Sequence, residues 1–223
     1  MRETLAEWAE DYRGRGKYTP VGVTFHWVMA ALVIYQLWSG WTMQRVLVGG
    51  DKLDFYQRHT ELGLLILLLA FCRFLWRMMV PGPINDADEQ GWRTTVAHLM
   101  HWALYLLFAV LPLTGWAMWS AIQPPRPLYL AGVIPLPPMP LHDLSVEWQW
   151  WVMETALSVH VYGVIALTIL VLGHAGAAIK HHFWDRDDVL EGMLPEVPDT
   201  TWHPGGPRYN PQAAQAHPVT TDG

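Results

Sequence analysis

The sequence predicts an all-α membrane protein, built as an antiparallel bundle of four transmembrane helices. The 223-residue chain contains long runs without Asp, Glu, Lys or Arg, such as residues 94–123 and 156–179, and a helical span needs about 20 mostly apolar residues. Many of its 14 Trp residues stand near the ends of such runs, where interfacial aromatic belts lie. The runs are too uniformly apolar for the one-sided burial of a soluble bundle.

Proline and glycine mark the expected limits of the spans. Pro20 suits the first turn of the first helix, and Pro81-Gly82-Pro83 ends the second. Pro112 lies inside the third run, where it predicts a kink that neighbouring helices can accommodate. The predicted spans are residues 21–43, 59–80, 94–122 and 150–181.

The length favours one membrane domain, expected over residues 19–195. Residues 1–18 lack the basic-then-apolar order of a signal peptide and are expected to form a cytoplasmic N-terminal segment. Residues 123–147 are rich in Pro and predict an external segment. Residues 196–223 are rich in Pro, Gly and Thr and predict a disordered tail.

Basic residues near the spans predict the orientation, because cytoplasmic loops carry an excess of Lys and Arg. With four spans, both termini lie on one side, which would hold eight such residues against four on the other. Both termini are therefore expected in the cytoplasm. The eight are Arg13, Arg15, Lys17, Arg73, Arg77, Arg93, Lys180 and Arg186, and the four are Arg45, Lys52, Arg58 and Arg126.

Charge and cysteine content exclude several classes of site. The net charge is −6, which argues against nucleic acid as a partner and leaves membrane lipid as the expected environment. Cys72 is the single cysteine, so an intrachain disulfide, a thiolate cluster and a Cys-x-x-Cys-His attachment site are all excluded.

Two histidines of the fourth run, His160 and His174, are fourteen residues apart. An α-helix places them about 21 Å apart along its axis and within about 40° of one azimuth. A polar group in lipid must be paired or face the bundle interior. The fourth helix therefore offers two inward imidazoles at two depths.

The antiparallel helix order supplies each of these imidazoles with a partner at its own depth. His26 and His174 lie near the cytoplasmic side, whereas His59 and His160 lie towards the outer side. Imidazole nitrogens are good axial ligands for haem iron. The sequence thus predicts two non-covalent b-type haems, each with bis-histidine ligation.

Other residues are candidates for holding the cofactor. Gly63 follows His59 by four residues, and Gly163 follows His160 by three, so that each can make room for a flat macrocycle or serve close helix packing. Arg73 and Arg77 return to the helical stripe of His59 and can pair with haem propionates, although arginines also end spans at the interface.

His98 and His101 open the third span on the cytoplasmic side. Either can replace His26 as a ligand. Alternatively, both can line a quinone pocket together with Trp102. The sequence leaves the two interpretations open.

Four segments together resemble, in order, the bacterial cytochrome b561 family over about residues 18–195. The chain departs from the family by its longer acidic N-terminus, Pro-rich outer loop and extended tail. The segments are YTPVGVTFHWVMAALVI, RHTELGLLILLLAFCRFLWR, AHLMHWALYLLFAVLPLTGWAM and SVHVYGVIALTILVLGHAGAAIKHHFWDRDDVLEGMLP.

The resemblance implies a four-helix, di-haem oxidoreductase of the bacterial inner membrane, with ligand positions that match His26, His59, His160 and His174. It also implies superoxide oxidase-like electron transport from superoxide to ubiquinone. Lys52, Arg58 and Arg126 would steer the anionic donor, although neighbouring Asp residues weaken that field.

Two alternative functions are weighed against this one. The chain can be the cytochrome b subunit of a larger hydrogenase or dehydrogenase complex, in which residues 1–18 and the Pro-rich loop dock a protein electron donor. It can also be a haem-free transporter that uses its histidines for metal-ion passage.

Overall fold

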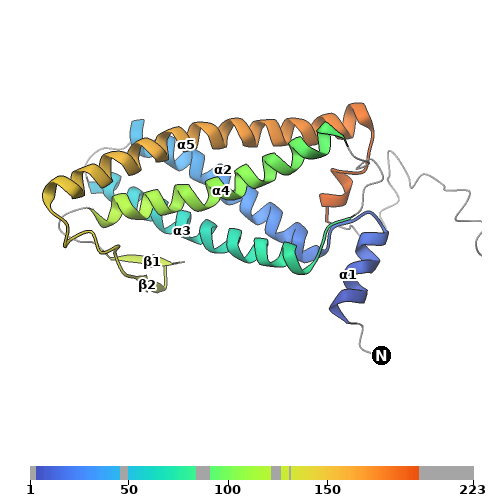
Figure 1. Cartoon of the computed structure of the whole chain (residues 1–223), viewed down its shortest axis with the longest axis horizontal. Helices are drawn as coiled ribbons and strands as arrows, with labels where there is room; N and C mark the ends of the chain where they lie inside the picture. Colours follow the sequence, from blue (N-terminus) through green and yellow to red (C-terminus); the bar gives the residue numbers. More distant parts are fainter. Residues whose placement is uncertain (1–3, 46–49, 84–90, 122–126, 131, 196–223) are drawn as a thin grey trace, which may run out of the picture.

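A computed structural model describes residues 4–45, 50–83, 91–121, 127–130 and 132–195. These residues form an elongated bundle of four long helices, which run alternately up and down (Figure 1), as the sequence predicts. We call the end that carries residues 4–18 and 186–195 the terminal end, and the opposite end the hairpin end. The long helices are α2 (Pro20–Arg45), α3 (Gly50–Met79), α4 (Trp92–Ser120) and α5 (Val146–Lys180).

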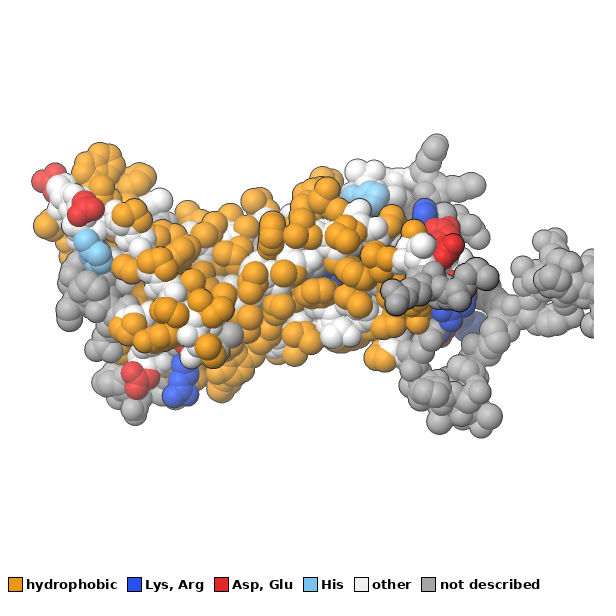
Figure 2. Space-filling view, turned by 90° about the horizontal axis from the view of Figure 1, so that it is seen from below, with side chains coloured by type: hydrophobic (Ala, Val, Ile, Leu, Met, Phe, Trp, Pro, Cys, Tyr) orange, Lys and Arg blue, Asp and Glu red, His pale blue; other side chains and the backbone are white. Residues whose placement is uncertain are grey.

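Each of these four helices is long and apolar enough to cross a bilayer. Large apolar side chains such as Ile34, Leu106 and Leu172 lie exposed on the outside of the bundle. On the face shown in Figure 2, apolar side chains cover the middle of the molecule, and most of the charged side chains lie towards its two ends. The chain is therefore a multi-pass membrane protein, with lipid as the solvent of its middle part.

The helices extend beyond the predicted spans. α3 begins at Gly50 rather than at residue 59, and α5 begins at Val146 rather than at residue 150. The added turns of α3 carry Lys52, Asp54 and Arg58. Hydropathy marks only the part of a helix that lies in lipid, whereas the backbone hydrogen bonds continue into the aqueous interface.

A short antiparallel hairpin adds two strands to the otherwise helical chain. It joins β1 (Leu128–Leu130) to β2 (Ile134–Leu136), with Leu128 opposite Leu136, inside the predicted external segment. The carboxylate of Glu61 on α3 accepts the backbone N–H of Tyr129 at 3.1 Å. The hairpin is therefore anchored on the bundle instead of extending freely.

The first helix, α1 (Leu5–Gly14), lies at the terminal end. It begins with a capping box, in which Glu7 Oε2 accepts the backbone N–H of Thr4 at 2.8 Å. This backbone bond lowers the pKa of the Glu7 carboxyl. Trp8 packs edge-on against Trp76 of α3 with ring centroids 6.5 Å apart, so part of the expected N-terminal segment is a docked helix.

After α5, the chain turns back along the terminal end through a π-helical turn, η2 (His181–Asp185), and a 3₁₀ turn, η3 (Glu191–Met193). The indole of Trp27 donates to the Met193 carbonyl at 2.7 Å. The N–H of Tyr18 donates to the Gly192 carbonyl at 3.2 Å. The C-terminal segment is thereby tied to the start of α2, and the predicted tail 196–223 lies outside the described residues.

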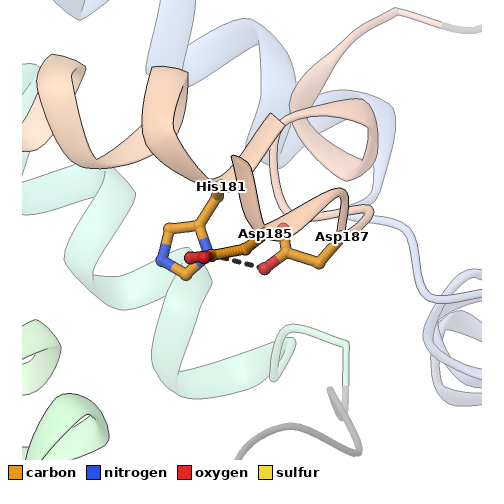
Figure 3. Close-up of side chains that lie close together, drawn as sticks. All are labelled: His181, Asp185 and Asp187. Atoms are coloured by element: carbon orange, nitrogen blue, oxygen red, sulfur yellow. Dashed lines mark hydrogen bonds and ion pairs between the residues drawn. The ribbon is translucent and has the colours of Figure 1, made fainter. Parts of the chain in front are cut away.

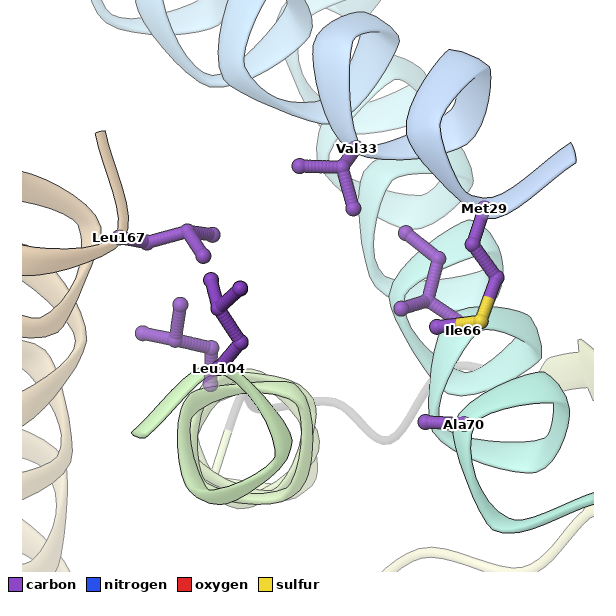
Figure 4. Packing of buried hydrophobic residues seen from close by; sticks show 7 residues of the cluster. Met29, Val33, Ile66, Ala70, Leu104 and Leu167 are labelled. Atoms are coloured by element: carbon purple, nitrogen blue, oxygen red, sulfur yellow. The ribbon is translucent and has the colours of Figure 1, made fainter. Parts of the chain in front are cut away.

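The main apolar core lies halfway along the bundle and joins all four long helices (Figure 4). Leu167 stands midway between His160 and His174 in the sequence of α5, so this core separates the depths of the two histidines. Its buried members are Met29, Val33, Ile66, Ala70, Leu104, Leu111 and Leu167.

We expect Leu128→Ala to loosen the hairpin, because Leu128 is 1% exposed and packs against Leu64 and Trp119. Truncation of a buried Leu costs about 2–5 kcal/mol. Limited proteolysis should cut the hairpin of this variant faster than that of the wild type. Val133→Ala, at a position that is 78% exposed, should leave cleavage unchanged. Equal cleavage of Leu128→Ala and the wild type would contradict the packing.

Candidate functional site

Two pairs of histidines face each other inside the bundle, one pair near each end. At the hairpin end, the rings of His59 on α3 and His160 on α5 have centroids 6.2 Å apart. At the terminal end, the rings of His26 on α2 and His174 on α5 have centroids 6.0 Å apart. The structure thus brings together the residues that the sequence analysis pairs by depth.

The separation of the rings fits a metal bound between them. A metal–imidazole bond is about 2 Å long, and the ring centre lies about 1 Å beyond the nitrogen, so two opposed ligands have centres about 6 Å apart. The Cα atoms of α5 approach those of α4 within 8 Å at many places, but hardly approach those of α2 or α3 in the described chain. The histidines therefore face each other between helices that are not tightly packed.

The surroundings of His160 decide which of its nitrogens carries the proton. Its Nδ1 lies 3.1 Å from the carbonyl oxygen of Leu111 and 3.0 Å from Thr114 Oγ1. A carbonyl oxygen can only accept, and the Thr114 hydroxyl donates its own proton to the same carbonyl at 2.8 Å. His160 Nδ1 is therefore the protonated nitrogen, and the Nε2 lone pair remains available to a metal.

His59 is held in the same way from α2. Its Nδ1 lies 2.8 Å from Ser39 Oγ, and the Ser39 hydroxyl donates to the carbonyl or side-chain oxygen of Gln36, at 3.0 and 3.2 Å. The Gln36 amide donates in turn to the His59 carbonyl at 2.7 Å. When the Ser39 hydroxyl donates to Gln36, Ser39 Oγ accepts from His59 Nδ1–H, and this arrangement leaves the Nε2 lone pair of His59 available to a metal.

Two glycines lie directly beside these imidazoles, where a Cβ would be in ordinary van der Waals contact with the ring. A Cβ at Gly40 would lie 3.5 Å from His59 Cε1, and one at Gly115 would lie 3.7 Å from His160 Cε1. Neither glycine was predicted from the sequence, and neither was Ser39. The sequence hardly distinguishes such residues, because small residues in an apolar helix more often serve helix packing than a binding site.

The two glycines that the sequence analysis does name lie at contacts between helices. A Cβ at Gly63 would stand 3.3 Å from Gln36 Nε2, and one at Gly163 would stand 2.8 Å from Leu111 Cδ2. Both neighbours belong to the network around the hairpin-end pair. These glycines therefore set how closely α2 and α4 approach the helices that carry His59 and His160.

At the terminal end, the half-buried Arg73 faces the histidine pair. Its Nη1 donates to the Gly22 carbonyl at 3.2 Å, and its Nη2 lies 3.5 Å from His26 Nδ1. Arg77 is exposed, and its guanidinium lies over the ring of Tyr18, 5.2 Å from the centroid. Arg73 is thus the cation that stands beside the pair, while Arg77 lies at the rim of the bundle.

A third imidazole approaches the terminal-end pair. The ring of His101 on α4 lies 5.6 Å from that of His174. His98, one turn earlier, is exposed, and Trp102 packs against Phe74 at a centroid distance of 6.1 Å. His174 therefore has two imidazole neighbours, His26 and His101, at comparable distances.

A separate cluster of His181, Asp185 and Asp187 closes the turn after α5 (Figure 3). His181 Nδ1 lies 2.5 Å from Asp187 Oδ2 and 3.5 Å from Asp185 Oδ2. The ammonium group of Lys180 also binds the Asp185 carboxylate. Both carboxylates therefore have partners within this segment, the imidazole of His181 and the ammonium group of Lys180. The cluster holds the turn around Arg186, whose backbone is left-handed with φ 55°.

A pocket opens at the hairpin end beside α2 and α3. It has a volume of about 230 Å³ and is lined by Tyr35, Arg58, Glu61, Leu62 and Gly132. The pocket thus combines the phenol of Tyr35 on α2 with the guanidinium of Arg58 and the carboxylate of Glu61, both within one turn of His59 in α3. Of the residues that line this pocket, Arg58 was predicted from the sequence to lie near the outer site, and the others were not.

Comparisons with known proteins identify the family of the chain. The model of the prokaryotic cytochrome b561 family matches residues 17–196. The chain is 26% identical to cytochrome b561 homolog 2 of Escherichia coli over 80% of this chain and 91% of that protein. It is also 26% identical to the probable superoxide oxidase CybB of Yersinia pestis, over 81% and 97% of the two chains. A cytochrome b562 of Cereibacter sphaeroides is 27% identical, over 79% and 94%.

The family match spans all four membrane helices and every histidine of the two pairs. Electron transport and b-type haem are therefore the chemistry expected of this fold, in keeping with its facing imidazoles. The chain belongs to the prokaryotic cytochrome b561 family of membrane electron-transfer proteins.

Proposed function

We propose that this protein is a di-haem cytochrome b that carries electrons from a small donor at the hairpin end to a membrane quinone at the terminal end. The observation that carries the proposal is the presence of two facing histidine pairs, His59 with His160 and His26 with His174, at opposite ends of the bundle. α5 places them about 21 Å apart along its axis.

In each site, the two imidazoles would hold one b-type haem between them. The bound haem would supply one-electron chemistry through its ferric and ferrous states. With both imidazoles bound, the site would suit electron transfer better than binding of a small ligand to the iron. Because Cys72 is the single cysteine, attachment through a pair of thioethers is excluded.

The chain offers further contacts to an anionic macrocycle. Arg73 stands beside His26 with its guanidinium turned into the bundle, and Arg77 lies one turn further towards the terminal end. Guanidinium groups pair strongly with carboxylates, so we assign both arginines to the propionates of the terminal-end haem. Gly63 and Gly163 allow the close helix approach that frames the hairpin-end haem.

Superoxide is the donor that we propose for the hairpin end. Lys52 and Arg58 lie at this end, and Arg58 lines the pocket beside His59, so that the local field can draw in a small anion. A relative in Yersinia pestis carries the name probable superoxide oxidase. Two superoxide anions would each give up one electron and leave as O₂, and one quinone would take up both electrons and two protons to become quinol.

We place the quinone, ubiquinone in the simplest case, beside His101, His98 and Trp102 at the terminal end. The ring centroids of His101 and His174 lie 5.6 Å apart. His101 is also exposed on the outside of the bundle, where a quinone could enter from the lipid. Imidazoles can hydrogen-bond to a quinone oxygen and hand over a proton. The apolar ring of Trp102 can cover the headgroup.

We propose that the protein lies in the bacterial inner membrane, with its terminal end in the cytoplasm. Arg13, Arg15 and Lys17 cluster beside the first span at that end, and Lys180 and Arg186 follow the last. Such an excess of basic residues marks the cytoplasmic side.

The purified protein is expected to hold two non-covalent b haems per chain, measured by haem extraction against protein content. His59→Ala and His160→Ala should each lose the same haem, identified by its reduced-minus-oxidised spectrum, because each removes an axial ligand. His26→Ala should lose the other haem, and His101→Ala should keep both. A colourless wild type would refute the proposal. If His101→Ala loses a haem and His26→Ala does not, the ligand opposite His174 is His101 of α4 and not His26.

The orientation can be tested with single cysteines in a Cys72→Ser background. A membrane-impermeant maleimide applied to spheroplasts should label Val133→Cys in the hairpin, because we place that end outside. It should leave Glu10→Cys in α1 unlabelled until the membrane is lysed. Labelling with the opposite preference would invert the direction proposed for electron flow.

His98→Gln combined with His101→Gln should slow the reduction of a soluble ubiquinone by superoxide at least tenfold while both haems are retained, because it removes the hydrogen-bonding groups of the proposed pocket. His182→Gln, which changes an imidazole at the same end that packs on Phe183, is the matched control. An unchanged rate of quinone reduction in the double variant would show that His98 and His101 do not form the quinone pocket. Inactivity of the wild type with superoxide, despite two intact haems, would favour a protein donor.

A further inference from the structure

We infer that Ser39 and Thr114 are positioning residues of the hairpin-end haem, which fix the protonation pattern and the ring orientation of both of its ligands. The inference rests on the proposed ligation by His59 and His160. It adds two residues from helices that carry no ligand of this haem, since Ser39 belongs to α2 and Thr114 to α4.

The contacts leave each hydroxyl little freedom. Ser39 is 1% exposed, and its oxygen lies within 3.2 Å of three partners: His59 Nδ1 and the two oxygens of Gln36. Thr114 Oγ1 donates to the Leu111 carbonyl and lies 3.0 Å from His160 Nδ1, and the same carbonyl lies 3.1 Å from that nitrogen. Because a carbonyl only accepts, His160 Nδ1 is the donor, shared between Thr114 and Leu111, and the bonds of Ser39 to Gln36 favour the same direction for His59.

This hydrogen bond has two consequences for a metal on Nε2. It holds the ring about its Cβ–Cγ bond, which fixes the plane of the ligand, and it raises the basicity of the coordinating nitrogen. A more basic ligand favours the ferric state over the ferrous state. Ser39 and Thr114 therefore lower the midpoint potential of the hairpin-end haem.

The terminal-end pair has a different environment. A guanidinium, Arg73, stands 3.5 Å from His26 Nδ1, and in the described part of the chain the ring of His174 makes no hydrogen bond. A nearby positive charge favours the state with one more electron. The hydroxyls therefore lower the midpoint potential of the hairpin-end haem, whereas Arg73 raises that of the terminal-end haem. This difference in potential favours electron transfer from the hairpin end to the terminal end.

The variants Ser39→Ala and Thr114→Val test the inference. Each removes one hydroxyl, and the second keeps the shape of the side chain. Thr42→Val and Thr168→Val are matched controls, because their hydroxyls bond only to carbonyls of their own helices, at 2.9 and 2.8 Å. Thr114→Ser keeps the hydroxyl and should restore the wild-type properties.

The measurements are a potentiometric titration of both haems, low-temperature electron paramagnetic resonance, and the rate of haem transfer to apomyoglobin. We expect a more positive potential and altered g values for one haem, namely the haem that His160→Ala loses. We also expect about tenfold faster transfer of that haem, the lower end of the usual effect of removing such a hydrogen bond. The terminal-end haem should keep its potential and its g values.

The possible failures can be told apart. If the wild type holds fewer than two haems, the proposed function fails first. If it holds two and neither potential moves in Thr114→Val, or if both move equally, the inference alone is overturned. Should Ser39→Ala fail to assemble in the membrane, the shape-preserving pair Thr114→Val and Thr114→Ser decides the question by itself.

Discussion

An imidazole inside a bilayer needs a partner within the protein, because hydrocarbon offers it none. This constraint organises the bundle. It turns His160 and His174 of α5 inwards at two depths, and it turns His59 and His26 to meet them at 6.2 and 6.0 Å between ring centroids. The helix α5 contributes a histidine to both sites, so the rise of this one helix sets the distance between them.

The apolar core follows from the same arrangement. Leu167 and its neighbours fill the layer between the two pairs, where polar groups would be costly. Consecutive helices pack closely, α2 on α3, α3 on α4 and α4 on α5, and the histidines face each other across the less closely packed combinations. The fold thus joins a well-packed middle to two sites with room between helices.

The two ends of the molecule are closed by different means. At the hairpin end, Glu61 and the apolar side chain of Leu128 hold the strands against α3 and α4. At the terminal end, Trp27 binds the chain after α5, and Trp8 of α1 packs on Trp76.

The four spans and the depth of each histidine could be predicted from the sequence, because hydropathy and helical periodicity are properties of one helix at a time. The predicted start of α3 was too late, because charged turns continue this helix outside the lipid. The contacts of Ser39 and Thr114 with the imidazoles, the places of Gly40 and Gly115 beside them, and the approach of His101 to His174 became visible in the folded bundle alone. Such contacts depend on how each helix is rotated and spaced against its neighbours, and this is fixed by packing among all four helices, which no single segment encodes.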